Sequence, residues 1–191
     1  MTLRLPRIAC TLVMVAWAGA IALASGSDLG QQGPQVVQPR ATAATSSSGN
    51  GNGPISITNS KANAAILTAA NMKPGSSASG TVTIASDSSV DTDISLAEQN
   101  LTDSGPGTLK LSGVLDLLIQ DVTTPTSTQT VYSGKLGAMP TLQLGTYPKR
   151  TSRTYRFTVT FPSTAASGYQ GRSTSAGFLW TEVKSTAGPK K

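Results

Sequence analysis

The sequence has no histidine and a single cysteine, Cys10, in 191 residues. Without imidazole, serine-type triads lack their base, and the helix-borne HExxH zinc site lacks its ligands. Cys10 lies in the N-terminal apolar run, so no disulfide can staple the rest of the chain. The nine acidic side chains are too few and too scattered for a metal centre built from carboxylates alone. We therefore expect no enzyme activity and no cofactor.

Charged and aromatic side chains are also scarce, at 13% and 5% of the chain. Fifteen basic against nine acidic residues give a net charge of +6. The basic residues lack the interleaved aromatic side chains that stack on single-stranded nucleic acid. We expect no nucleic-acid partner. The modest positive charge is compatible with adhesion to anionic polymers.

The N-terminus has the order of a secretory signal peptide. Arg4 and Arg7 precede an uncharged, mostly apolar run, Ile8–Ala24, which ends in small residues. An uncleaved anchor is the alternative, because the run reaches the lower limit for a membrane span, about 17 residues. The polar residues Ser25–Ser27 favour cleavage. This pattern predicts a secreted or cell-surface protein that meets the membrane only through its signal peptide.

Four segments follow from composition. Residues 1–24 are the predicted signal peptide, 25–54 a flexible tether rich in Gly, Ser, Pro and Gln, 55–184 a folded domain, and 185–191 a basic tail. Within the tether, Val36 and Val37 form a small apolar island before Pro39, which is most simply a chance hydrophobic pair.

The domain alternates between polar and apolar residues over short stretches separated by turns. After the Pro74-Gly75 turn, Ser79–Ala85 places Val82 and Ile84 on one face. Leu111–Ile119 also fits a helical period, but the flanking breakers favour a strand. The other expected strands lie within 55–58, 64–70, 91–96, 131–136, 142–144, 153–161 and 173–183. About eight or nine short strands predict an all-β, antiparallel β-sandwich.

Two clusters of charge have possible binding chemistry. Asp87, Asp91 and Asp93 resemble the oxygen-rich loops that bind calcium, although ordinary turn aspartates explain them better. Lys149, Arg150, Arg153 and Arg156 are candidates for contact with an anionic polysaccharide or cell-wall polymer. More often, such a run protects a solvated strand edge from unwanted pairing.

An ordered series of motifs from about Ile55 to Val183 resembles the TasA/camelysin family. The matching stretches are Asn71–Ser76, Thr81–Ile84, Asp93–Leu96, Val131–Leu136, Thr154–Pro162, Tyr169–Ser173 and Phe178–Trp180. The resemblance implies a jelly-roll-like sandwich. It also implies a structural protein of the bacterial biofilm matrix, assembled into fibres when a strand of one subunit completes the sheet of the next. Camelysin-type members are described as surface metalloproteases, an activity that the missing histidine argues against.

Strand addition is also the mechanism that the residues themselves allow. An open sandwich has unpaired backbone groups at its edges, and a β-prone segment of a neighbour can pair with them. The candidate segments are the Val36-Val37 island and Ile55–Thr58, which contains Ile55 and Ile57. Pairing of Ile55–Thr58 within its own domain is at least as probable. We expect a self-associating matrix protein, with a monomeric adhesion module that binds anionic polymers as the alternative.

Overall fold

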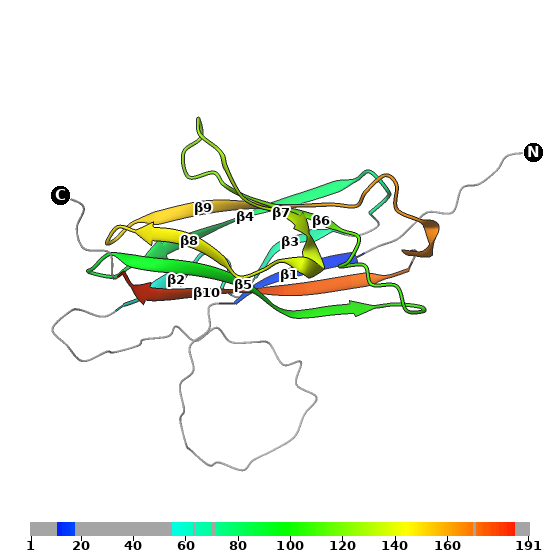
Figure 1. Ribbon diagram of the computed structural model, residues 1–191, viewed down its shortest axis with the longest axis horizontal. Coiled ribbons are helices and arrows are strands. Elements are labelled where there is room, and N and C mark those ends of the chain that lie inside the picture. Colours follow the sequence, from blue (N-terminus) through cyan, green and yellow to red (C-terminus); the bar gives the residue numbers. More distant parts are fainter. Residues whose placement is uncertain (1–10, 18–54, 63, 70–71, 170, 186–191) are drawn as a thin grey trace, which may run out of the picture.

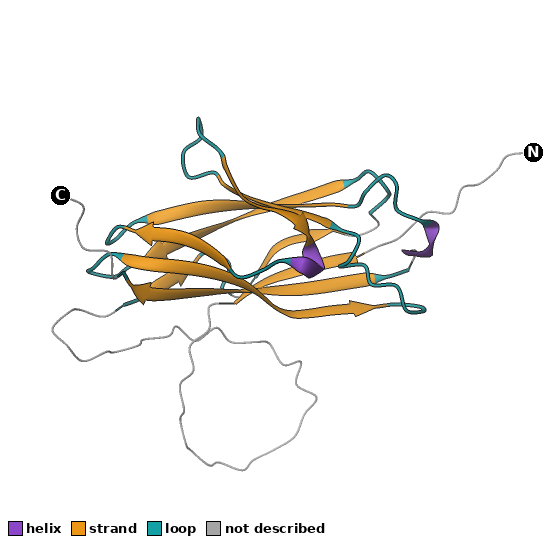
Figure 2. Cartoon of the chain, in the orientation of Figure 1, coloured by secondary structure: helices purple, strands orange, loops and turns teal. Residues whose placement is uncertain are grey.

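The computed structural model describes residues 11–17, 55–62, 64–69, 72–169 and 171–185, which form two five-stranded sheets packed face to face (Figures 1 and 2). One sheet has the order β3-β1-β10-β5-β8 and the other β2-β4-β9-β6-β7. The strands are β1 Thr11–Trp17, β2 Ile57–Asn59, β3 Ala65–Ala69, β4 Ser77–Ser86, β5 Thr92–Ser104, β6 Asp116–Asp121, β7 Gln129–Lys135, β8 Leu142–Tyr147, β9 Ser152–Thr160 and β10 Ser173–Lys184. The expected all-β sandwich is confirmed. No helix in these residues is long and apolar enough to cross a bilayer.

Alternation along the strands builds the core. Tyr155 and Phe157 in β9 face Phe178 and Trp180 in β10, and all four side chains are buried. The ring centroids of Tyr155 and Trp180 lie 5.3 Å apart, and those of Phe157 and Phe178 lie 4.9 Å apart. Offset and edge-on aromatic pairs at these separations add to the stabilisation from burial. These residues were expected on the core face from their period of two.

Leu111–Ile119, which fits the period of a helix as well as that of a strand, forms a strand only in its second half. Leu115, Leu117 and Ile119 are fully buried, as the period of two predicts, and a turn at residues 112–114 precedes β6. The strand β5 continues to Ser104, eight residues beyond the expected end at Leu96. The 3₁₀-helices η1 Leu136–Ala138 and η2 Ser167–Tyr169 were not expected.

β3 comes very close to β4 of the opposite sheet at Gly80. A Cβ atom at Gly80 would lie 1.9 Å from the carbonyl oxygen of Ile66, which is far inside van der Waals contact. Only glycine leaves room for the β3 backbone here. Gly80 therefore fixes the position of β3, an edge strand of its sheet.

One strand departs from the expected organisation. Thr11–Trp17, inside the predicted signal peptide, forms β1 between β3 and β10. It pairs parallel to β10 and antiparallel to β3, and every other pairing among the described strands is antiparallel. Figure 1 shows β1, in blue, beside the orange β10. Within the described chain, β3 therefore joins its sheet only through β1.

Candidate functional site

The position between β10 and β3 is the first candidate site, and we call it the strand seat. Its walls are the backbones of Ser173–Leu179 in β10 and of Ala65–Ala69 in β3. Thr11 to Trp17 lie opposite Ser173 to Leu179 in an unbroken parallel register. On the other side the antiparallel register runs from Leu12–Ala69 to Val15–Ala65, with one irregularity. A strand of about seven residues completes the sheet.

The walls of the strand seat belong to the hydrophobic core. Thr174, Ala176 and Phe178 of β10 are at most 3% exposed, and Ile66 and Leu67 of β3 are at most 5% exposed. A strand seated in this register places alternate residues beside the inner-face positions of β10. An empty seat would leave two rows of backbone N–H and C=O groups without partners, which costs free energy wherever water cannot replace them. Pairing with a β-strand in the seat is therefore energetically favourable, because it satisfies these backbone groups.

Of the residues expected to supply a donor strand, some are paired within the domain and others lie outside the described residues. Ile57 lies in β2, where Ile57–Asn59 pairs with β4 of the same chain. The intramolecular pairing, considered above as the alternative, is thus the arrangement of this segment, and Ile55 is half-buried just before it. Val36 and Val37 lie outside the described residues. Of the two candidate segments, only the Val36-Val37 island is not already part of a described sheet.

The four basic residues do not share one surface. Lys149 and Arg150 are exposed in the β8–β9 turn, and Arg156 is exposed in β9. Arg153 instead lies on the inner side of β9, where Nη1 donates to the carbonyl oxygen of Leu144 at 2.9 Å. Its Nη2 donates to the carbonyl oxygen of Thr146 at 3.0 Å. Arg153 is thus held by its own fold, which leaves three of the four side chains on the exterior.

The three aspartates also have separate partners. The carboxylate of Asp87 accepts a hydrogen bond from the Thr58 hydroxyl. Asp91 accepts from the backbone N–H of Lys149 at 3.0 Å. Asp93 accepts from the Thr146 hydroxyl at 2.6 Å. Among the described residues no three acidic, histidine or cysteine side chains gather closely enough to hold a metal ion. These contacts fit the interpretation as turn and strand-end aspartates.

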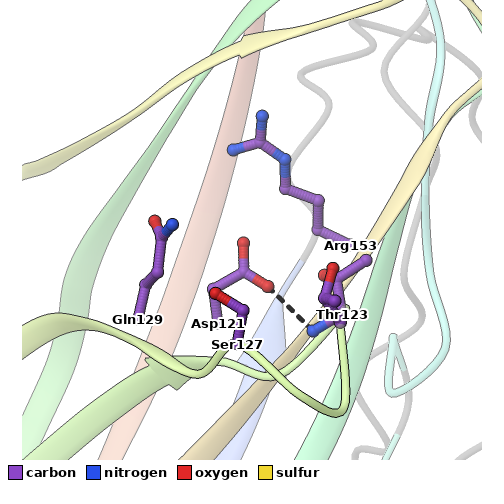
Figure 3. A pocket seen from close by; sticks show the side chains of 6 residues that line it. Asp121, Thr123, Ser127, Gln129 and Arg153 are labelled. Atoms are coloured by element: carbon purple, nitrogen blue, oxygen red, sulfur yellow. Dashed lines mark hydrogen bonds between the residues drawn. The ribbon is translucent and has the colours of Figure 1, made fainter.

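A third feature was not found from the sequence: a polar cleft where the edge strands β7 and β8 face each other (Figure 3). Two adjoining hollows of about 260 and 270 Å³ share Asp121, Gln129 and Arg153. Figure 3 shows these three side chains pointing the same way from different strands. One feature of the sequence could have indicated this cleft. At the end of each row of inward-facing apolar residues stands a charged residue: Asp121 follows Ile119, and Arg153 precedes Tyr155.

Tyr155, which lines this polar cleft, forms a buried pair with Tyr147. The hydroxyls of Tyr147 and Tyr155 are 2.5 Å apart, and both residues are at most 1% exposed. Burial raises the pKa of both phenols, and the mutual contact raises that of Tyr147 further. The guanidinium of Arg153 lies 4.4 Å from the centre of the Tyr147 ring, a cation–π distance. Both phenols therefore stay neutral donors and acceptors across the physiological pH range.

Comparison with known proteins adds no assignment. The sequence matches no protein-family model, and no curated protein matches it.

Proposed function

We propose that this chain is a secreted structural protein of the cell surface or biofilm matrix whose copies assemble into fibres by β-strand addition. The observation that supports the proposal most directly is the strand seat, whose occupant is drawn from the predicted signal peptide. Removal of residues 1–24 would take the whole of β1 away from its place in the middle of a sheet. A strand from another copy would then restore the lost pairing.

The walls suit this exchange because each has support of its own. β10 is paired with β5 along its full length, from Ser173–Ser104 to Lys184–Thr92. β3 packs closely over Gly80 of β4, in the opposite sheet. Both walls therefore have contacts that do not depend on β1. A prepared groove costs an incoming strand less ordering than a groove that must first form.

The donor that we propose is the segment around Val36 and Val37, in the tether that precedes the domain. Pairing of this segment with the next copy is head-to-tail, because the donor segment and the seat are different surfaces of one chain. Contacts of this kind continue indefinitely unless the rotation between copies closes a ring, and so they give filaments. The 16 residues between Val37 and Pro54 could span roughly 50 Å when extended, enough to reach a neighbour.

Electron microscopy of the protein recovered from culture medium tests the proposal. We expect fibres from the natural chain and no fibres after deletion of residues 31–38. The matched control is deletion of residues 46–53, an equally long piece of the tether with no apolar residue. This control should still assemble. Fibres that persist in the first variant, or that vanish equally in both, would overturn the donor assignment.

The alternative is a monomeric adhesion module that grips anionic polymers through Lys149, Arg150 and Arg156, which are exposed. It predicts monomers in light scattering and salt-sensitive binding to a polyanion. Replacement of Lys149 and Arg150 by serine should abolish that binding and leave the protein monomeric. A fibre-forming chain whose polymer binding is negligible would exclude the alternative.

A further inference from the structure

We propose that the polar cleft between β7 and β8 binds an uncharged saccharide. The cleft lies on the side of the sandwich formed by β7 and β8, whereas β2 and β3 are the edge strands of the opposite side. The inference is therefore independent of strand addition, because the strand seat and the cleft use different surfaces.

The opposite charges in the cleft disfavour a ligand that carries a strong charge of one sign. Asp121 and Arg153 line both hollows, yet they form no ion pair with each other. An anion would meet the carboxylate of Asp121, and a cation would meet the guanidinium of Arg153. A neutral ligand that both donates and accepts hydrogen bonds meets neither penalty.

Unused hydrogen-bonding capacity faces the same space. One oxygen of Asp121 accepts from the backbone N–H of Thr123 at 2.9 Å, and within the described residues the other oxygen has no partner. The amide of Gln129 also has none. Thr124, Ser127 and Thr130 contribute hydroxyls to the rim. A carboxylate, an amide and several hydroxyls form the mixed donor and acceptor set that adjacent sugar hydroxyls require.

The fixed part of the cleft can orient a ligand without large rearrangement. Arg153 is anchored by the carbonyl groups of Leu144 and Thr146, and the Thr123 hydroxyl accepts from the backbone N–H of Thr154 at 2.9 Å. Each hollow lies just below the usual size range of pockets for drug-sized molecules, and their lining is mostly polar. These dimensions suit one or two sugar rings of a chain that continues into solvent, rather than an apolar compound.

Titration of the secreted protein with soluble neutral oligosaccharides, followed by calorimetry or NMR, tests the proposal. The panel is cellohexaose, maltohexaose, chitohexaose and xylohexaose, with hexagalacturonate as the anionic comparison. We expect at least one neutral chain to bind. Gln129→Ala should weaken binding about 3- to 10-fold and Asp121→Asn about 10- to 100-fold, as loss of a neutral and a charged hydrogen bond implies.

Two variants on the same strands but outside the cleft serve as matched controls. Gln120→Ala truncates the side chain next to Asp121 in β6, and Ser133→Ala truncates an exposed side chain of β7. Both should bind as the natural chain does. Absence of binding by every neutral chain at millimolar concentration, preference for hexagalacturonate, or equal weakening in the controls would overturn the inference. Gln129 is exposed, so its variant stays interpretable even if Asp121→Asn reduces stability.

Discussion

At the scale of single residues, the most unusual side chain is Glu98. It follows Ile94 and Leu96 on the inner face of β5, where the first two residues are fully buried. One carboxyl oxygen of Glu98 is buried without a hydrogen-bond partner in the described structure. Burial, followed by the nearby charge of Asp103, raises its pKa from 4.5 to about 7. A carboxyl group at an apolar position therefore makes this fold sensitive to pH.

The raised pKa fixes the sign of that dependence. Between pH 4.5 and about 7 the folded chain binds the Glu98 proton more strongly than the unfolded chain, so the free energy of unfolding decreases as pH rises. Glu98→Gln should flatten this decrease and stabilise the protein at pH 8 by roughly 1 kcal/mol, a value reduced for partial exposure. Urea unfolding at pH 5 and pH 8 measures it, with Gln99→Ala as control. Parallel pH profiles of Glu98→Gln and the natural chain would contradict the assignment.

At the scale of elements, alternation made nearly every strand of the domain predictable. Tyr155, Phe157 and Val159 could be placed on the core face because every second residue of β9 is apolar. The second half of β5 was missed because its inner-face residue is Glu98, which interrupts the pattern while β10 still pairs with it. The place of β1 could not be read from the sequence at all. A run that fits a signal peptide gives no local indication that a sheet has room for it.

The close approach of β3 makes position 80 intolerant of any side chain. Gly80→Ala would bring a Cβ atom against the Ile66 carbonyl group, so β3 must move away from β4. Overpacking of this kind costs about 1–3 kcal/mol, and we expect the upper end because a backbone atom is in the way. Thermal unfolding measures the loss. Gly113→Ala is the matched control, because its added Cβ would meet Lys110 at an ordinary 3.5 Å. Equal melting temperatures for the two variants would show that β3 is not held in this way.

At the scale of the whole molecule, the candidate sites depend on the arrangement of strands more than on motifs. The basic run was visible in the sequence, but in the fold Arg153 points away from the other basic residues and lines the polar cleft. That cleft joins residues of β6, β7, β8 and β9, whose spacing in the chain carries no sign of their proximity. The strand seat likewise joins β3 to β10 across the length of the domain. Sequence periodicity therefore predicts the two sheets, whereas the order of the strands determines which residues come together in the candidate sites.

The strand order also predicts how the uncleaved chain behaves. With Thr11–Trp17 between β3 and β10, the full chain fills the strand seat with a seven-residue strand of its own, paired with Ser173–Leu179. A chain that begins at residue 25 lacks this segment, and under the proposed mechanism it takes the missing strand from another copy. After both chains are refolded from denaturant, light scattering should show a monomer for the full chain and growing assemblies for the shorter one. A synthetic peptide of residues 11–17 should slow that growth, whereas a scrambled peptide should not. Equal growth of both chains would mean that the seat does not control assembly.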